Sequence, residues 1–406
     1  MASGQRFRIL KPTSDRKGLR LFAHRAAKDF LCGWLYPRAY KRVSRKKPLD
    51  PRKVVFVESK LGPMPDSFVL IWKSLEASGR YDLEYRTMGA KSVGLPTYMK
   101  NGYDLVKNIA NARCVFLCDA NDVVSCVPLR KGTDIVQLWH ACGAFKKWGM
   151  STVDKKFGAT REDIQRHPYY GNLSLVTVSS PDIEWAYIEA MKLEDTPEIV
   201  QPVGVSRTDV FFDSEFLDEA QRVVHESVPG INGRKIILYA PTFRGHVKDA
   251  TGPGELDIAA MKKSLGDRYA LLIKHHPYVL DPPPIPQGCE DFAFMLPGFP
   301  IDKLLATADV CITDYSSIVF EYSLFSRPMA FFAPDIDDYD DWRGFYYDYD
   351  DLTPGPVFAE TNPLIEWINS LDDGFDASEM NAFREKFMGA CDGHSTERIL
   401  ATIGLL

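Results

Sequence analysis

Residues 310–325 read VCITDYSSIVFEYSLF and contain the pattern that decides the fold. The run from Val310 to Thr313 is short and apolar, and a polar turn separates it from Ile318 to Phe325, where apolar residues recur at helical spacing. Because the run lacks the alternation of a half-exposed strand, we expect a strand that is buried on both faces of a sheet. The stretch therefore predicts one strand–turn–helix unit of an α/β fold.

Similar units occur along most of the chain, in two series. Helix-like segments at 66–77, 98–109 and 183–190 separate the apolar runs of the first series. Alternating strands and helices predict parallel sheets covered by helices on both faces, so two series predict two doubly wound, Rossmann-like domains. The expected strands are 54–57, 83–86, 114–117, 135–138, 175–178 and 199–203, followed by 236–240, 269–273, 292–295, 310–313 and 329–332.

The two series meet near residues 206–232, where a charged helical stretch gives way to Pro229, Gly230 and Gly233. A chain of 406 residues is long enough for two such domains with separate cores. We expect the following division: a basic amphipathic arm at residues 1–52, an N-terminal domain at 53–215 and a C-terminal domain at 216–406.

The composition excludes several classes of protein. Hydrophobic residues make up 45% and charged residues 26% of the chain, which argues against disorder, and no apolar run approaches the roughly 18 residues needed to cross a bilayer. The 8 cysteines have neither zinc-site nor disulfide-framework spacing, and the N-terminus lacks the features of a signal peptide. We therefore expect a protein of the reduced, cytosolic compartment.

The charge is distributed unevenly, with a basic arm on an acidic body. Residues 1–53 hold 16 Lys and Arg against 3 Asp and Glu, whereas the rest of the chain holds 33 basic and 52 acidic residues. Between Leu19 and Leu35, apolar residues recur at three- and four-residue steps with cations between them, which is the pattern of a basic amphipathic helix. Such a helix can lie on an anionic membrane or pack on the protein body with a solvated basic face. We favour the cytoplasmic membrane surface over nucleic acid, because phosphates would repel the acidic body.

Polar side chains follow four of the expected strands, at the end where open parallel sheets bind ligands. His140 follows the run 134–139, Thr242 and Arg244 follow 236–240, His276 follows 269–273, and Ser316 with Ser317 follow 310–313. We therefore expect one ligand cleft shared by the two domains.

Several of these residues suit a phosphate. Ser316 and Ser317 stand at an expected helix start, whose free N–H groups and dipole favour anions, and Glu321 one turn later could hold ribose hydroxyls. Arg244, Lys274 and His276 add cations and donors. Each could instead have a structural role, as an N-cap, a solvated helix face or a hydrogen-bonding group. The Walker-A and GxGxxG spacings are both missing from the sequence.

His140 is the candidate general base, since a His after a buried strand and before a glycine-containing turn can present its ring to a ligand. A buried structural His is the alternative. Cys142 has no paired residues that would support a role as nucleophile. The eight Asp residues between 335 and 351 include the triplets 338–340 and 348–350, which could hold a metal, but a solvated acidic loop fits their aromatic, turn-like context better. We therefore expect neither a metal nor a cofactor.

Taken together, these motifs resemble the CDP-glycerol glycerophosphotransferase family of teichoic acid synthesis. The resemblance spans roughly residues 54–360, and its ordered set of motifs is more specific than any one of them. It departs from the usual pattern at Ala141, where Gly is more usual, and at Glu321, where Asp is more usual. The matching elements are QLWH at 137–140 with Lys146, Lys147 and Gly149; Gly204, Arg207 and Asp209; YAPTFR at 239–244; KHHP at 274–277; DYSSIVFE at 314–321 with Arg327, Pro328 and Asp335; and RGFY at 343–346 with PGP at 354–356.

The resemblance implies a GT-B architecture, two Rossmann-like domains across a cleft, and metal-independent transfer of glycerol phosphate from CDP-glycerol. The acceptor would be a hydroxyl of a lipid-linked saccharide or polyol-phosphate chain, held on the side of Lys146 and Lys147. His140 would deprotonate it, while His276, Arg244 and the N–H groups of Ser316 and Ser317 would stabilise the phosphates; Arg343 would also serve the donor. A CDP-ribitol or capsule-type transferase is the nearest alternative; a UDP-sugar glycosyltransferase and a non-catalytic CDP-binding scaffold are more distant ones.

Overall fold

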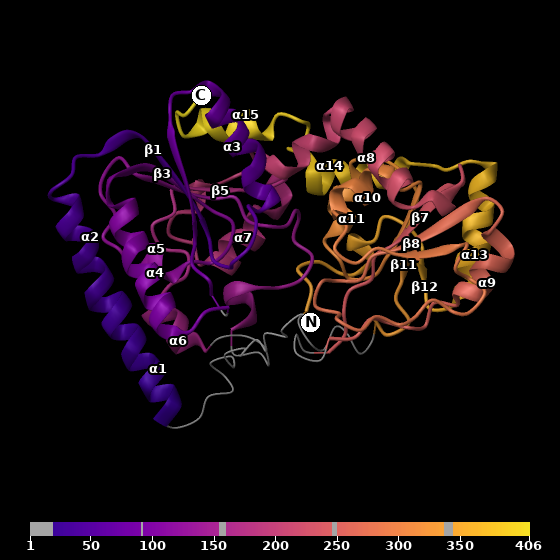
Figure 1. Cartoon of the computed structure of the whole chain (residues 1–406), viewed down its shortest axis with the longest axis horizontal. Helices are drawn as coiled ribbons and strands as arrows, with labels where there is room; N and C mark the ends of the chain where they lie inside the picture. The colour runs from indigo at the N-terminus through magenta and orange to yellow at the C-terminus, as the bar shows by residue number, and fades with distance from the viewer. Residues whose placement is uncertain (1–18, 91, 154–159, 246–249, 337–343) are drawn as a thin grey trace, which may run out of the picture. The chain divides into compact units, whose positions relative to one another are not determined.

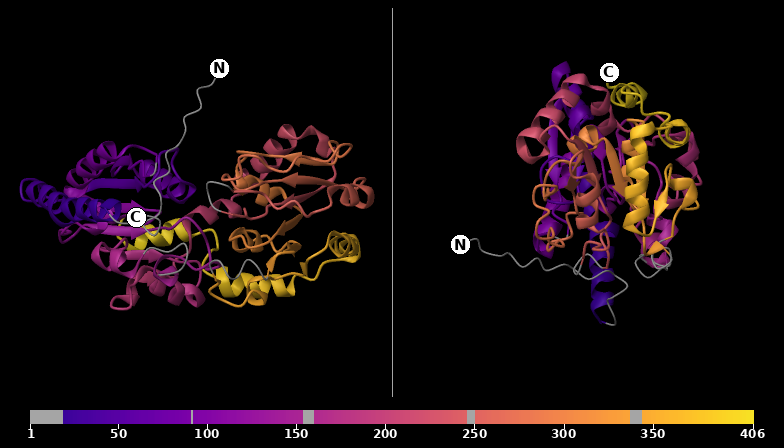
Figure 2. Two further views of the ribbon diagram at one scale, coloured as in Figure 1. Left: turned by 90° about the horizontal axis from the view of Figure 1, so that it is seen from below. Right: turned by 90° about the vertical axis from the view of Figure 1, so that its right-hand side faces the viewer.

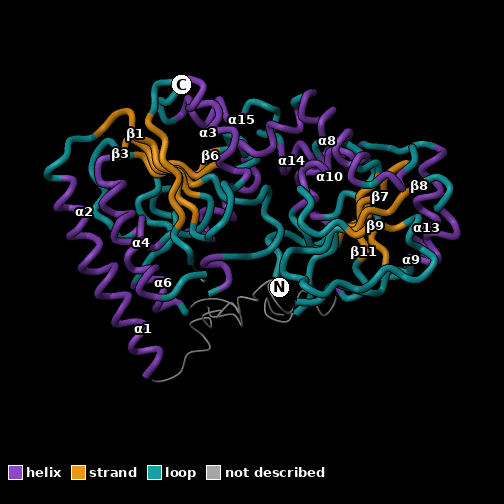
Figure 3. The backbone as a smooth tube through the Cα atoms, in the orientation of Figure 1, coloured by secondary structure: helices purple, strands orange, loops and turns teal. Residues whose placement is uncertain are grey.

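The computed structural model describes residues 19–90, 92–153, 160–245, 250–336 and 344–406, with side chains from residue 22 onward. The chain forms two compact units. The first comprises residues 1–140, 147–207 and 394–406, and the second comprises residues 141–146 and 208–393. Each unit contains a six-stranded parallel sheet with helices on both faces (Figures 1 and 3), which confirms the predicted α/β class with two doubly wound sheets.

The sheet of the first unit has the strand order β2-β1-β3-β4-β5-β6, with every neighbouring pair parallel. Val54 of β1 lies opposite Leu83 of β2 on one side and Cys114 of β3 on the other. All six expected strands are present. Their bounds are β1 Asp50–Glu58, β2 Asp82–Thr87, β3 Ala112–Leu117, β4 Asp134–Gln137, β5 Leu175–Thr177 and β6 Val200–Gln201.

Alternate residues of these strands enter two different cores, as the apolar runs predict. Val55 and Val115 pack into one hydrophobic cluster, while their neighbours Phe56 and Phe116 pack into another on the opposite face. The helices of the first unit are α1 Leu19–Phe30, α2 Tyr36–Ser44, α3 Asp66–Ser78, α4 Leu95–Asn108, α5 Asp122–Ser125, α6 Arg161–Arg166, α7 Glu184–Met191 and α15 Ser395–Thr402, with the π-helix η2 Leu31–Leu35 and the 3₁₀ turns η3 Ile109–Asn111, η4 Gly149–Thr152, η5 Pro181–Ile183 and η6 Pro197–Ile199.

The second unit repeats the design with the order β12-β11-β10-β7-β8-β9, again all parallel. The five expected strands are present, and β12 is an additional two-residue edge strand that the sequence pattern was too short to indicate. Its strands are β7 Lys235–Tyr239, β8 Tyr269–Ile273, β9 Ala293–Met295, β10 Val310–Thr313, β11 Met329–Phe332 and β12 Val357–Phe358; its helices are α8 Ser214–Ser227, α9 Ile258–Leu265, α10 Ile301–Thr307, α11 Ile318–Ser323, α13 Thr361–Ser370 and α14 Ser378–Met388, with the 3₁₀ turns η8 Pro229–Ile231, η9 Asp350–Leu352 and η10 Leu371–Asp373, and η7 Ser206–Phe212 begins at the end of the first unit.

The observed units differ from the expected division at three places. The arm helices belong to the first unit, residues 141–146 and 208–215 belong to the second, and residues 394–406 return to the first. The return is explained by burial: Ile399 and Leu400 enter the core beside α3, and Arg113 donates a hydrogen bond to the Ile403 carbonyl (2.7 Å). Figures 1 and 2 show this C-terminal helix, in yellow, among the elements of the first unit.

The arm forms a continuous helical segment in which η2 separates α1 from α2. Pro37 lacks an N–H, and its ring would clash with the preceding turn of a regular α-helix. The helix is wider at this point, and the Tyr36 N–H reaches the Leu31 carbonyl five residues back. Leu31, Tyr36 and Tyr40 are buried in the core of the first unit, among residues of α4 and β3. Leu31 belongs to the apolar side of the predicted amphipathic helix. The protein body already covers it, so it is not available for burial in a membrane.

The opposite side of the arm is exposed. Phe22 is 72% exposed, Phe30 50% and Trp34 46%. The cations nearer the start of the arm pair with the body: Arg25 contacts Asp163 (2.7 Å), and Lys28 contacts Asp122 (2.8 Å). The arm thus packs on the protein body with one side and exposes the other, as the packing interpretation expected, and contact with a membrane stays a prediction. Within the described residues, no helix combines the length and the hydropathy that crossing a bilayer requires.

Candidate active site

His140 lies just beyond the carboxyl end of β4 and is held at two points. Its Nδ1 lies 3.0 Å from the Cys118 carbonyl oxygen at the end of β3, and Arg207 donates from Nη1 to the His140 carbonyl oxygen (2.9 Å). A carbonyl can only accept, so Nδ1 carries the proton and Nε2 of the neutral ring has the free lone pair. The ring is therefore in the tautomer that a general base needs.

The charges around His140 act in opposite directions. His140 is exposed by its surface area, but nearby protein atoms partly desolvate the ring, and this desolvation lowers the pKa of His140 below its ordinary value. The carboxylate of Asp119 and the Cys118 carbonyl raise the pKa, whereas Lys60 and Arg207 lower it further. The net effect keeps the imidazole neutral near pH 7, so it can accept a proton.

In the second unit, three adjacent parallel strands bring most of the predicted donor residues to one edge. The central part of the strand order is β10-β7-β8, and Ser316 and Ser317 follow β10, Thr242 and Arg244 follow β7, and His276 follows β8. The Thr242 N–H donates to Asp314 Oδ1 (2.8 Å), which ties the first two groups together. The ring centroids of Phe243 and His276 lie 4.9 Å apart, so the residues after β8 contact those after β7.

The turn before α11 has the form expected from the sequence. Ser317 is the N-cap residue, without a side-chain capping bond, and Ser316 Oγ accepts from the Ile318 N–H at 3.4 Å. Glu321 is only 3% exposed, so the alternative of a solvated helix face is wrong for this residue. Thr242 is 7% exposed, and its Oγ1 has no hydrogen-bond partner among the described residues, which leaves it able to bind a ligand.

Arg244 lies between two carboxylates. Its Nε and Nη2 donate to Asp335 (2.5 and 3.0 Å), and its Nη1 donates to the Thr242 carbonyl (2.6 Å) and lies 2.9 Å from Asp314 Oδ2. Burial acts to lower the pKa of Arg244, but the two carboxylates outweigh it and hold the pKa above its ordinary value. The cation that the sequence assigned to the phosphates is thus neutralised within the protein.

Lys274 is a better placed cation. It is half-buried, and burial lowers the pKa of its amine without an offsetting carboxylate among the described residues. His276, two residues later, packs against the rings of Phe243 and Tyr278, and its Nδ1 accepts from the Tyr278 N–H (3.2 Å). That bond assigns the proton of the neutral ring to Nε2, which can donate to a phosphate oxygen.

The remaining predicted residues are distributed differently from expectation. Lys146 falls in the second unit, where it forms a backbone bridge with Phe345, whereas Lys147 falls in the first. Cys142 is buried. Arg343 and the triplet 338–340 lie outside the described residues, and Asp348 and Asp350 are exposed. Within the described ranges, no group of three or more His, Cys, Asp and Glu side chains has the arrangement of a metal site.

Comparison with known proteins agrees with this geometry. Residues 39–405 match the family described as CDP-Glycerol:Poly(glycerophosphate) glycerophosphotransferase. The chain belongs to this family. It is a transferase of teichoic acid biosynthesis. The chain is 33% identical over 370 residues to the teichoic acid ribitol-phosphate primase of Bacillus spizizenii, covering 90% of this chain and 94% of that protein. It is 27% identical over 305 residues to the teichoic acid glycerol-phosphate primase of Bacillus subtilis, covering 74% and 76%.

Solved structures share the fold of this transferase. The wall teichoic acid polymerase TagF aligns with a TM-score of 0.71 at 21% identity, covering 96% of this chain and 98% of that chain. A UDP-N-acetylglucosamine 2-epimerase aligns with a TM-score of 0.55 at 11% identity, covering 89% and 97%. At these identities the similarity concerns the fold alone, and it agrees with the predicted GT-B fold.

Proposed function

We propose that the protein transfers a polyol phosphate from a CDP-polyol to a hydroxyl group of a lipid-linked saccharide or polyol-phosphate chain and releases CMP. The observation that carries the proposal is the state of His140: with Nδ1–H bound to the Cys118 carbonyl, Nε2 is free to take the acceptor proton. In a phosphotransferase of this family, that is the role a base beside the acceptor must fill.

In the proposed reaction, the acceptor oxygen gives its proton to His140 Nε2 and attacks the phosphorus that bears the polyol. The bond from that phosphorus to the bridging oxygen breaks, and CMP leaves with the electron pair. Lys274, the Nε2–H of His276 and the turn at Ser316 and Ser317 would stabilise the charge that grows on the phosphate oxygens. Such transfers depend on positioning and electrostatics more than on covalent chemistry.

Arg244 has a modified role in this proposal. Because Asp314 and Asp335 already bind its guanidinium, it would organise the loop after β7 and orient the Thr242 hydroxyl, and any phosphate contact would compete with the two carboxylates.

Glu321, which is buried beside this edge, remains the proposed partner of the ribose hydroxyls. Lys146, Lys147 and Arg343 keep the roles that the family resemblance implies.

Two donors are candidates. The motifs resemble those of a family named for CDP-glycerol, but the identity and coverage are higher with the ribitol-phosphate primase than with the glycerol-phosphate primase. The decisive experiment incubates purified protein and a lipid-linked acceptor with radiolabelled CDP-glycerol or CDP-ribitol and measures CMP release and labelled product. Release from neither donor would refute the proposal, and competition between the two would identify the polyol.

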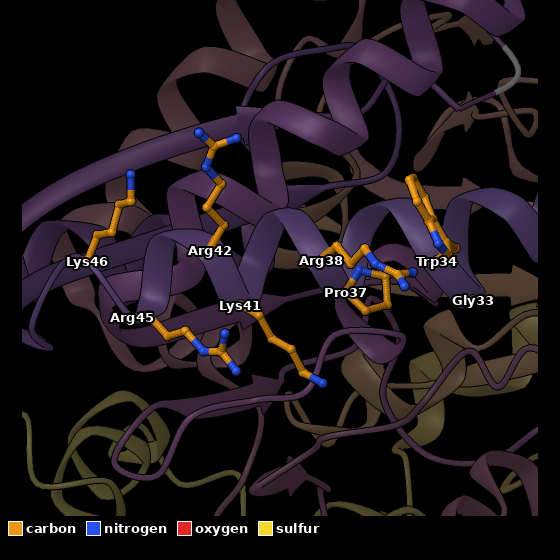
Figure 4. A pocket seen from close by; sticks show the side chains of 8 residues that line it. All are labelled: Gly33, Trp34, Pro37, Arg38, Lys41, Arg42, Arg45 and Lys46. Atoms are coloured by element: carbon orange, nitrogen blue, oxygen red, sulfur yellow. The ribbon is translucent and has the colours of Figure 1, made fainter.

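We also propose that the arm holds the enzyme peripherally on the cytoplasmic face of the membrane. Figure 4 shows side chains that line an open groove along η2 and α2. The exposed ring of Trp34 stacks on Phe30 (5.3 Å between centroids) and lies under the Arg38 guanidinium (4.3 Å). Aromatic rings beside a row of cations suit the interface of an anionic bilayer. The lining residues are Gly33, Trp34, Pro37, Arg38, Lys41, Arg42, Arg45 and Lys46.

A further inference from the structure

Trp139, the residue before His140, has an unusual backbone conformation. Its φ is 57°, in the left-handed region that bulky side chains rarely adopt. The other non-glycine residues with positive φ in the described structure are Asn172, Lys192, Asn232 and Ser326, of which Lys192 is a helix C-cap and the asparagines tolerate this region. Trp139 is 7% exposed and lies next to the candidate base, so its conformation requires specific support.

Two side chains supply that support by binding both peptide groups of Trp139. Gln137 accepts from the Trp139 N–H through Oε1 (3.0 Å), and Ser67 donates from Oγ to the Trp139 carbonyl (2.8 Å). Gln137 also donates from Nε2 to the Asp119 carbonyl (3.1 Å), so its amide links the ends of β4 and β3. Gln137 is fully buried and Ser67 is 2% exposed.

Burying polar groups of this kind is unfavourable unless they are hydrogen-bonded. An apolar residue at position 137 would fill the same space without that cost, as its sequence neighbours Val136 and Leu138 do. Its two bonds instead fix the backbone on either side of the left-handed turn. The consequence appears one residue later, where the His140 ring meets the Cys118 carbonyl and lies 4.3 Å from the Trp139 ring.

We propose that Gln137 and Ser67 are positioning residues for polyol-phosphate transfer, which hold Trp139 in its left-handed conformation and thereby aim His140 Nε2 at the acceptor hydroxyl. The inference rests on the proposed function, because it assigns these residues a role in that reaction. All the residues involved belong to the first unit, so their replacement is expected to leave donor binding by the second unit unchanged.

The test uses full-length Gln137→Met and Ser67→Ala, which remove the two bonds while nearly preserving side-chain volume. Ser78→Ala is the matched control for Ser67, since it lies in the same helix and its Oγ, among the contacts described, donates to the Leu75 carbonyl (2.7 Å) and accepts from the Arg80 N–H (3.2 Å), both within three residues of it and far from Trp139 in the sequence. Gln201→Met, at the end of β6, is the control for Gln137. Ser67→Thr keeps the hydroxyl and should restore activity.

Four quantities are measured: kcat for CMP release, the donor Kd by calorimetry, the thermal midpoint of unfolding, and the nitrogen shifts of His140 in protein labelled with ¹⁵N-histidine. We expect kcat to fall at least 10-fold in both variants, the donor Kd to stay within 2-fold, and the Nδ1–H tautomer of His140 to be lost or mixed. Both controls and Ser67→Thr should match the wild type.

Wild-type kcat and tautomer in Gln137→Met and Ser67→Ala would overturn the inference. It would also be overturned if kcat, donor affinity and thermal midpoint fell together, because that result describes a general loss of structure. The tautomer measurement needs no substrate. If the wild type transferred neither polyol phosphate, the proposed function would fail, and the imidazole spectra would still decide whether the two residues position His140.

Discussion

Arg244 donates two hydrogen bonds to the Asp335 carboxylate, from Nε at 2.5 Å and from Nη2 at 3.0 Å, while its Nη1 faces the fully buried Asp314. Asp335 follows β11 and Asp314 follows β10, so one guanidinium connects the ends of neighbouring strands with the loop after β7. The group is therefore part of the framework of the donor edge.

Replacing Arg244 by Ala should destabilise the second unit strongly. The change would leave Asp314 buried without its cation, and breaking a buried pair in this way costs about 3–5 kcal/mol. Urea unfolding would measure the loss. Arg268→Ala is the control, because Arg268 pairs with Asp372 at the surface, where such pairs contribute about 0–1 kcal/mol. Equal midpoints for the two variants would mean that the Arg244 pair contributes no more than a surface pair.

Donor affinity should depend on Lys274 and His276. A hydrogen bond to a charged group contributes about 1.5–3 kcal/mol, so Lys274→Ala or His276→Ala should raise the Kd for the CDP-polyol roughly 10- to 100-fold in calorimetry. His225→Ala, on α8 of the same unit, should have no effect. If all three variants bound the donor like the wild type, the phosphates would have to lie elsewhere.

Removal of the His140 imidazole should affect chemistry and not donor binding. A general base typically contributes about 10²- to 10⁴-fold in rate, so we expect that loss of kcat in His140→Ala with an unchanged donor Kd. His394→Ala replaces a surface histidine of the same unit and should retain full activity. Normal turnover by His140→Ala would assign the base to another group.

The pH dependence follows from the direction of the His140 pKa shift. Desolvation lowers this pKa, so kcat/KM should fall on the acid side only below the ordinary imidazole value of about 6.5. The same shift means that the unfolded chain binds the proton more readily, so His140 contributes stability above pH 6.5 that is lost as the pH falls through its folded pKa. Asp119 faces the ring and raises its pKa, whereas Lys60 and Arg207 lower it, so Asp119→Asn should move the acid limb to still lower pH. A limb above pH 6.5 would contradict this account.

The strand ends could be predicted from sequence because a parallel sheet places them all at one edge. This rule alone predicts that His140, Thr242, His276 and Ser316 reach such an edge, and the structure places the last three after adjacent strands. The rule names residues that reach the edge but not the partners they meet there. Asp335 is 91 positions from Arg244, and no local pattern indicates that the two side chains pair.

Two other features escaped prediction for different physical reasons. The left-handed conformation of Trp139 opposes the local preference of a bulky residue. It depends on contacts with Ser67 and Gln137, and the contact with Ser67 cannot be predicted from the local sequence. For the arm, helical periodicity indicated an apolar side but not what covers it. The core of the first unit covers Leu31, Tyr36 and Tyr40, whereas Phe30 and Trp34 are left exposed.

Deleting the arm would therefore be a poor test of membrane binding, since the deletion would remove part of a core. A sharper test reverses charge at three exposed positions of the groove, in the variant Lys41→Glu/Arg42→Glu/Arg45→Glu. Each cation near an anionic bilayer contributes about 1 kcal/mol, so losing three should weaken binding to phosphatidylglycerol vesicles more than about 100-fold. Co-sedimentation at low salt measures the change.

The matched control reverses three exposed lysines elsewhere on the first unit, Lys73, Lys100 and Lys131, and gives the same change in net charge. It should still sediment with the vesicles, because those positions lie outside the groove. Salt should weaken wild-type binding only in part, since screening acts on the cations and not on the rings of Phe30 and Trp34. Trp34→Ser should remove much of the salt-resistant remainder. Equal loss of sedimentation in the groove variant and the control would show that net charge alone governs binding. Full sedimentation of the groove variant, or no sedimentation of the wild type, would refute a membrane role for the arm.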